Sequence, residues 1–228
     1  ILVYCYKLLL LTTIILINLQ IFLLFMHVKK VSTGSYDLNK WLFGGYETDV
    51  ITMIAGPPGS GKTNFCILAS CSQAKKGNKV IFIDSEGGFS TERVKQIAAE
   101  NYEDILKNIF LLQPTNFDEQ KKCFSQLLDK LKRQKAEPLA TSSASSQSKG
   151  HVSLIIVDGM ATLYRLNLGE GREDDRKVKE TNWKMAEQMR MLAEISRKQK
   201  IPVIITNQVY SGFLSEDELK KGIKKQVN

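Results

Sequence analysis

The fold of this chain is decided by residues 50–63, which read VITMIAGPPGSGKT. Residues 50–55 are apolar and rich in β-branched side chains, a composition that predicts a buried strand. The residues that follow match the phosphate-loop pattern G-x-x-x-x-G-K-S/T, and a helix is expected from about Lys62. Such a loop places backbone N–H groups at the positive end of a helix, where they bind phosphate oxygens. The order of strand, loop and helix therefore predicts a site for a nucleoside triphosphate.

The ligands expected at this loop are ATP and Mg²⁺. Lys62 is expected to reach the β and γ phosphates, and Thr63 to bind the metal ion. The alternative interpretation, an ordinary glycine-rich turn, is disfavoured because the loop stands between a strand and a helix. The expected ATP-binding residues of the loop are Gly56, Pro57, Pro58, Gly59, Ser60, Gly61, Lys62 and Thr63.

The rest of the chain alternates between short apolar runs and amphipathic segments. Further strands are predicted at residues 80–83, 109–112, 152–157 and 203–206, and further helices at 92–100, 117–131 and 174–198. Because each strand is apolar on both faces, the pattern predicts a mostly parallel sheet between two layers of helices. The expected fold class is therefore three-layer α/β, and ligands of such a sheet bind at the carboxyl ends of its strands.

Polar residues at the strand ends are the candidates for chemistry. Asp158, after the apolar run at 154–157, is the preferred carboxylate for holding the metal ion, with Asp84 as the alternative. Glu86 is the candidate for orienting or deprotonating the attacking water, provided that the second strand neighbours the first. Gln208 follows the fifth strand, where an amide can sense the γ-phosphate. By position alone, an ordinary turn residue is an equally good interpretation of Gln208.

Residues 1–25 differ in character from the rest of the chain. They contain one charged residue, Lys7, and residues 8–25 are 18 positions without a charge, a minimal length for spanning a bilayer. One interpretation is a membrane anchor with a cytoplasmic carboxyl flank. The other, which we favour, is that these residues come from translation upstream of the true start at Met26. On that interpretation a membrane is not a partner.

The overall composition is that of an ordinary soluble protein with one principal domain. Hydrophobic residues make up 43% and charged residues 25%, which excludes a disordered chain or a multi-span membrane protein. The expected organisation is a core at 26–213, a serine-rich flexible insertion at 138–150 and a lysine-rich tail at 214–228. A net charge of +8 suits nucleic acid or an anionic membrane surface as partner. The cysteines form no C-x-x-C pair, so a reducing compartment, the cytoplasm, is expected.

The motifs that carry a family resemblance lie between residues 32 and 210. They read STGS at 32–35, LFGG at 42–45, GPPGSGKT at 56–63, IDSEG at 83–87, TER at 91–93, LIIVD at 154–158 and TNQV at 206–209. In this order and spacing the set resembles the RecA/RadA recombinase superfamily. Within it, the chain is most similar to the archaeal RadB group, short paralogues without the N-terminal DNA-binding domain of RadA. The resemblance implies a RecA-like fold.

The resemblance also implies roles for particular residues. Glu86 falls at the position of the family's catalytic glutamate, and Gln208 at that of the glutamine that couples the γ-phosphate to a DNA-binding loop. Arg93 falls where the family stacks an arginine on adenine. Residues 164–176 occupy the place of the first DNA-binding loop, although acidic residues in the same stretch make a solvated mixed-charge loop an equally good interpretation. The candidate DNA contacts in that stretch are Arg165, Arg172 and Arg176.

The chain departs from the family pattern after Val209. The family continues through a second DNA-binding loop into further strands, whereas here residues 210–213 lead to a capping box at 215–218 and a short lysine-rich helix. We therefore expect the C-terminal edge strands of the sheet to be missing. Truncation, a frameshift and an unusually short variant are the open explanations.

The expected function is that of an ATP- and DNA-binding protein of DNA repair and homologous recombination. The resemblance implies weak Mg²⁺-dependent hydrolysis of ATP to ADP and phosphate, and a regulatory rather than a strand-exchanging role. The expected partners are DNA and a RadA-type recombinase or other repair proteins. Two alternatives remain: a KaiC-like ATPase that switches protein partners, and a membrane-tethered nucleotide-binding protein.

Overall fold

The structure, a computed structural model, describes residues 29–136, 151–169 and 175–209. The chain divides into two units, Ile1–Lys30 and Val31–Asn228, and the described fold belongs almost entirely to the second. The segment 1–25, the insertion 138–150 and the tail 214–228 lie outside the described residues. Among the residues that are described, none of the helices has the length and apolar character needed to cross a membrane.

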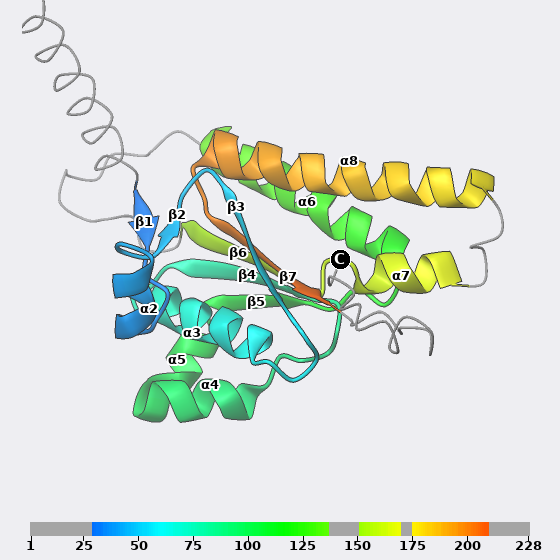
Figure 1. The fold of residues 1–228 in the computed structure, drawn as a ribbon. Helices are drawn as coiled ribbons and strands as arrows, with labels where there is room; N and C mark the ends of the chain where they lie inside the picture. Colours follow the sequence, from blue (N-terminus) through cyan, green and yellow to red (C-terminus); the bar gives the residue numbers. More distant parts are fainter. Residues whose placement is uncertain (1–28, 137–150, 170–174, 210–228) are drawn as a thin grey trace, which may run out of the picture. The chain divides into compact units, whose positions relative to one another are not determined.

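A five-stranded parallel sheet forms the centre of the described fold (Figure 1). Its strands are β3 (Ile51–Gly56), β4 (Lys79–Asp84), β5 (Ile109–Leu112), β6 (Val152–Asp158) and β7 (Val203–Gln208). Their order across the sheet is β3-β7-β6-β4-β5. A separate two-stranded sheet pairs β1 (Lys30–Val31) with β2 (Tyr46–Glu47). The predicted strands and their parallel arrangement are confirmed.

Helices cover both faces of the sheet, as Figure 1 shows. One face carries α3 (Lys62–Ala74), α4 (Thr91–Ala98) and α5 (Tyr102–Leu106), and the other carries α6 (Phe117–Ala136) and α8 (Asp175–Gln199). The remaining helical elements are α2 (Tyr36–Trp41), the 3₁₀ turn η1 (Ala99–Asn101) and α7 (Thr162–Leu168). The three-layer α/β class expected from the sequence is confirmed.

The strand β6 shows why the apolar runs predict a sheet buried on both faces. Its residues alternate in direction, so Ile155 and Val157 pack into the core beneath α6 and α8, while Leu154 and Ile156 pack into the core beneath α3. All four side chains are fully buried. Each contributes about 1.5–3 kcal/mol relative to an exposed position. A central parallel strand therefore needs a continuous apolar run rather than an alternating one.

The structure decides one condition that the sequence left open and corrects two local expectations. The second strand of the pattern, β4, does not neighbour β3, because β6 and β7 lie between them. The helix expected at 92–100 ends at Ala98, where Ala99 takes a positive φ of 54° and the chain turns into α5. A helix, α7, begins at Thr162 and covers the first part of the stretch 164–176 that the resemblance assigned to a loop; its Leu163 is buried.

Candidate functional site

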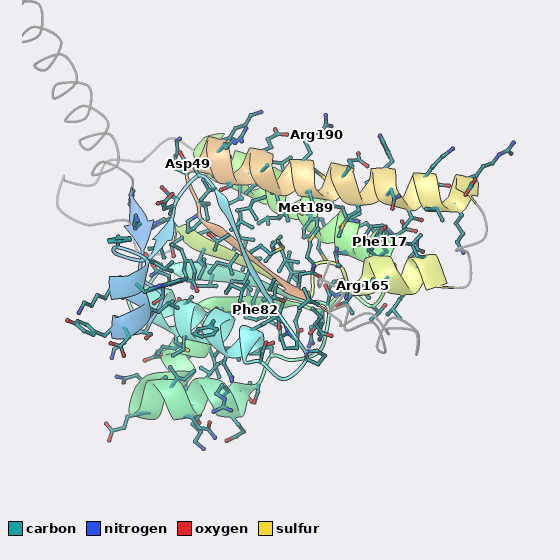
Figure 2. All side chains as sticks on the ribbon, viewed as in Figure 1. Asp49, Phe82, Phe117, Arg165, Met189 and Arg190 are labelled. Atoms are coloured by element: carbon teal, nitrogen blue, oxygen red, sulfur yellow. The ribbon has the colours of Figure 1, made fainter. Side chains whose placement is uncertain are left out.

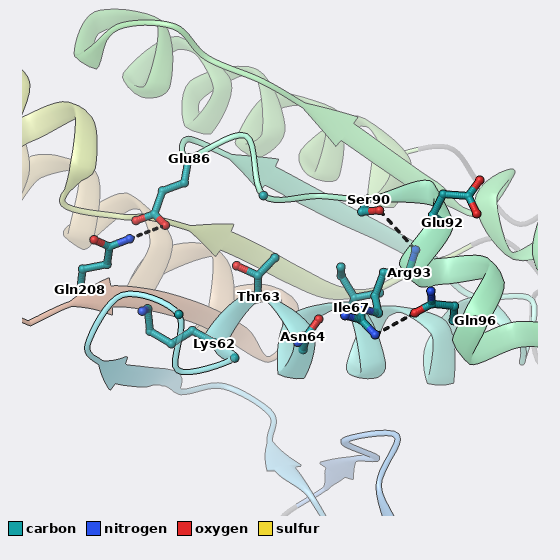
Figure 3. Close-up of a pocket in the computed structure, with 13 residues that line it drawn as sticks. Lys62, Thr63, Asn64, Ile67, Glu86, Ser90, Glu92, Arg93, Gln96 and Gln208 are labelled. Carbon is teal, nitrogen blue, oxygen red and sulfur yellow. Dashed lines mark hydrogen bonds between the residues drawn. The ribbon is translucent and has the colours of Figure 1, made fainter.

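The register of the sheet brings the candidate residues to one edge. Gly56 at the end of β3 pairs with Gln208 at the end of β7, and Asp84 at the end of β4 pairs with Asp158 at the end of β6. A polar pocket of about 370 Å³ lies at this edge. Residues expected from the sequence line it, among them Gly59, Lys62, Thr63, Glu86, Arg93 and Gln208 (Figure 3).

The phosphate loop leads directly into the first turn of α3. Gly61 is the N-cap residue and has a φ of 86°, in the left-handed region that glycine adopts without strain. No side chain caps the helix. The first N–H groups of α3 therefore remain available to an anion at the positive end of the helix dipole.

Lys62 places a buried ammonium group in the loop. The residue is 6% exposed, and its Nζ donates to the carbonyl oxygens of Gly56 at 3.2 Å and Pro57 at 2.9 Å. These acceptors are neutral, so they satisfy hydrogen bonds without cancelling the positive charge. A buried cation of this kind favours an anion next to the loop.

Asp158 is fully buried and is held by two threonine hydroxyls. Thr63 Oγ1 donates to its Oδ2 at 2.7 Å, and Thr206 Oγ1 donates to its Oδ1 at 2.6 Å. Burial raises the pKa of the Asp158 carboxyl, the two hydrogen bonds oppose that shift, and the nearby carboxylates of Glu86 and Asp84 add to it. Ionisation of Asp158 is thus less favourable than that of an exposed aspartate, and a cation beside it would oppose this shift.

Replacing Asp158 by asparagine is expected to raise the midpoint of thermal unfolding of the nucleotide-free protein by about 2–5 °C at pH 7. A raised pKa means that stability falls as the pH rises above the ordinary value of 3.8, since the folded state resists ionisation. The uncharged amide removes this penalty and still accepts a threonine hydrogen bond. The difference should shrink as the pH falls towards 4, which calorimetry over a pH series can measure.

The matched control is Asp104, an exposed carboxylate that pairs with Lys107 at 2.8 Å. A hydrogen bond from Lys107 lowers the pKa of Asp104, so Asp104→Asn should leave the midpoint unchanged or slightly reduced. A midpoint for Asp158→Asn at or below that of the wild type at pH 7 would contradict the prediction.

Both carboxylate oxygens of Asp84, the alternative metal candidate, accept hydrogen bonds from backbone N–H groups. Its Oδ1 accepts the N–H groups of Glu86, Gly87 and Gly88 at 3.2, 2.8 and 3.1 Å. Its Oδ2 accepts the N–H of Phe89 at 3.0 Å. The side chain therefore folds the loop that follows β4, and of the two aspartates only Asp158 contacts Thr63.

Glu86 reaches the pocket although β4 is not next to β3. Its Oε1 accepts a hydrogen bond from Thr162 Oγ1 at 2.8 Å. Its Oε2 accepts one from Gln208 Nε2 at 2.9 Å, which Figure 3 shows. The condition of neighbouring strands is not met, but the loop shaped by Asp84 carries Glu86 to the same pocket as Lys62.

Sequence reasoning missed the role of Gly159, directly after Asp158. Its φ is 82°, and a Cβ atom built there would lie 2.4 Å from Cγ of Glu86. Only glycine leaves room for the Glu86 side chain in this conformation. A glycine immediately after a strand-end aspartate was the available signal. Thr206 was part of a quoted motif, but its hydrogen bond to Asp158 was not anticipated.

The structure describes three of the four arginines proposed from the sequence, and each belongs to a different helix. Arg165 lies in α7, where its Nη2 donates to the carbonyl oxygen of Gln208 at 2.7 Å and approaches Asn207 Oδ1 at 3.4 Å (Figure 2). Arg176 is an exposed residue of α8. Arg172 lies outside the described residues. Arg93, in the first turn of α4, lines the pocket and donates to Gln96 Oε1 at 2.7 Å.

The fold and the pocket define a class of protein. A phosphate loop before α3, a strand-end aspartate beside the loop threonine and a parallel sheet are the features of RecA-like phosphate-loop α/β proteins. A family model described as Rad51 matches residues 26–226, and the chain belongs to this family. The resemblance inferred from the sequence motifs is confirmed.

Several curated relatives carry the description "DNA repair and recombination protein RadB". The protein of Methanosphaera stadtmanae is 37% identical over 180 residues, which is 79% of this chain and 68% of the relative. That of Methanobrevibacter smithii is 34% identical, covering 86% of this chain and 73% of the relative. That of Methanocaldococcus jannaschii is 40% identical, covering 75% and 71%.

Proposed function

We propose that this chain is an ATP- and DNA-binding protein of DNA repair and homologous recombination with weak Mg²⁺-dependent ATPase activity. The observation that carries the proposal is one pocket lined by Lys62, Thr63 and the Glu86–Gln208 pair, with the buried Asp158 hydrogen-bonded to Thr63. Membership of the Rad51 family and the description of the RadB relatives support the role in repair.

The residues present fit a nucleoside triphosphate. The uncapped N-terminus of α3 and the ammonium of Lys62 supply positive charge at the loop. A Cβ built on Gly59 would meet no atom within 4 Å, so the loop presents open space next to its backbone. Arg93 lines the same pocket and is the proposed contact for the adenine ring.

Thr63 and Asp158 are the proposed holders of Mg²⁺. The hydroxyl oxygen of Thr63 has lone pairs for a metal ion, and Asp158 provides a carboxylate beside it. A cation there would offset the burial penalty of the Asp158 charge. When bound, Mg²⁺ supplies positive charge that stabilises the phosphate oxygens during transfer of the γ-phosphoryl group.

Glu86 is the proposed group that orients the attacking water and accepts its proton. Hydrogen bonds to both carboxylate oxygens fix its orientation, one from Thr162 and one from Gln208. Gln208 is the last residue of β7, and its side-chain amide contacts Glu86. It can therefore respond to both the pocket and the chain that follows. We propose that this glutamine couples nucleotide state to DNA binding.

The test of the proposed function measures two affinities of the 228-residue chain. Calorimetry with Mg²⁺ and ATP reports nucleotide binding, and fluorescence anisotropy with single-stranded DNA at 50 and 200 mM salt reports DNA binding. We expect both, with DNA affinity falling steeply as salt rises. ATP binding with assembly but no salt-sensitive DNA affinity would favour the KaiC-like alternative, and the absence of both would overturn the proposal.

Replacing Glu86 by glutamine is expected to slow ATP hydrolysis by about 100-fold or more while leaving ATP affinity within about twofold. Glutamine has nearly the same shape and keeps an acceptor for Thr162, but it cannot accept a proton. A phosphate-release assay measures the rate, and Glu100→Gln, at an exposed position in the turn after α4, is the control. Equal rates for Glu86→Gln and the wild type would remove Glu86 from the mechanism.

A further inference from the structure

Two side chains of α7 contact the functional groups of the pocket. Thr162 and Arg165 are three residues apart, so they lie on the same face of the helix. Thr162 Oγ1 donates to Glu86 Oε1 at 2.8 Å, and Arg165 Nη2 donates to the carbonyl oxygen of Gln208 at 2.7 Å. One short helix therefore holds both the proposed base and the backbone of its glutamine partner.

These contacts close a ring of hydrogen bonds. From α7 the ring passes through Arg165 to Gln208, from the Gln208 amide to Glu86 Oε2, and from Glu86 Oε1 back through Thr162 to α7. The N–H of Val209 also donates to the carbonyl oxygen of Gly56 at 3.1 Å, which ties the end of β7 to the phosphate loop. A displacement of α7 would thus move Glu86 and Gln208 together.

The other side of α7 is anchored in the fold. Leu163 is buried. The ring of Tyr164 packs edge-on against Phe117 of α6, with 5.9 Å between the ring centroids, and the Tyr164 hydroxyl donates a hydrogen bond to Asn182 Oδ1 of α8. The N–H of Thr162 donates a hydrogen bond to the carbonyl oxygen of Gly159 at 3.0 Å, which fixes the start of α7. The helix is therefore a firm support from which to orient a catalytic carboxylate.

We infer that Thr162 and Arg165 are positioning residues, which hold Glu86 and Gln208 in a fixed orientation relative to the phosphate loop. This inference rests on the proposed function, because Glu86 is the proposed base. Arg165 thereby positions the end of β7, in addition to being a candidate DNA contact. Orientation of a base within a fraction of an ångström affects the rate of reaction far more than it affects binding.

The experiment uses Thr162→Val, which removes the hydroxyl with little change of shape, and Thr162→Ser, which restores it. We expect Thr162→Val to lower kcat for ATP hydrolysis about tenfold with KM for ATP unchanged within twofold. Thr162→Ser should return kcat to within about threefold of the wild type. Arg165→Met should lower kcat by a similar factor, since it removes the N–H donor to the Gln208 carbonyl.

A second readout needs no nucleotide. Unfolding equilibrium constants are measured for Thr162→Val, Glu86→Ala and the double variant. If the two side chains are in contact, Thr162→Val should raise the unfolding equilibrium constant about fivefold less in the Glu86→Ala background than in the wild type. The control pair, Thr162→Val with Glu100→Ala, should show independent effects.

The outcomes separate the inference from the proposed function. Absence of ATP hydrolysis by the wild type would overturn the proposed ATPase activity, and the unfolding cycle would then decide the contact alone. Hydrolysis by the wild type with an unchanged kcat for Thr162→Val would overturn the inference and leave the ATPase standing. Loss of kcat that Thr162→Ser fails to restore would also overturn it, because a structural defect would then be the cause.

Discussion

Replacing Lys62 by alanine is expected to lower the affinity of the chain for ATP by about 100-fold or more. The ammonium of Lys62 is buried at the loop and donates to two neutral carbonyl oxygens, so its charge is available to phosphate. Charge-assisted hydrogen bonds are worth about 1.5–3 kcal/mol each, and more than one is lost. Titration calorimetry with Mg²⁺ and ATP gives the dissociation constants directly.

Lys75, just after the last turn of α3, provides the matched control. It is an exposed lysine at the opposite end of the same helix, and Lys75→Ala should leave ATP affinity within about twofold. Both variants should keep the far-ultraviolet circular dichroism of the wild type. An ATP affinity for Lys62→Ala equal to that of the wild type would exclude the loop as the phosphate site.

Replacing Gly159 by alanine is expected to reduce ATP hydrolysis by about 100-fold and to destabilise the fold by about 1–3 kcal/mol. The new Cβ would lie 2.4 Å from Cγ of Glu86, so the carboxylate must leave its place between Thr162 and Gln208. The φ of 82° adds backbone strain that any residue other than glycine incurs. ATP affinity should change much less, because Gly159 does not line the pocket.

Gly77 separates the strain from the steric clash. Its φ of 81° nearly equals that of Gly159, and it lies after the C-terminal end of α3, away from the pocket. Gly77→Ala should therefore cost a similar stability from backbone strain but leave hydrolysis within about twofold. If both variants lose activity equally, backbone strain alone explains the loss and the steric role of Gly159 is wrong.

The strands and the loop could be predicted because their signals are local. The apolar run before Gly56 and the run that ends at Asp158 each form a strand that is covered on both faces. Such a strand needs apolar side chains at consecutive positions, and this pattern is visible in the sequence. The glycines and Lys62 of the phosphate loop likewise stand in one motif. The order of residues in that motif, directly after an apolar run, was enough to place them at a strand end.

The order of the strands and the contacts between loops could not be predicted. Nothing local indicates that β6 and β7 lie between β3 and β4, because strand pairing depends on which crossover packs where. The Thr162–Glu86 hydrogen bond joins residues 76 positions apart, and α7 overlaps the stretch 164–176 that the family resemblance assigned to a loop. The positional argument for Glu86 required β4 to neighbour β3, a condition that the sheet does not meet, so the family resemblance was the sounder ground for choosing this residue.

The loop after β4 assigns shape and chemistry to different residues. Asp84 accepts the main-chain N–H groups of the next residues, and the N–H that position 86 donates does not depend on the side chain there. Glu86 can consequently be exchanged for another residue, proline excepted, while the loop keeps its path. Asp84 thus fixes the path of the loop, while the side chain at position 86 supplies the chemistry. A different side chain at position 86 would face the pocket from the same backbone and would suit a different reaction.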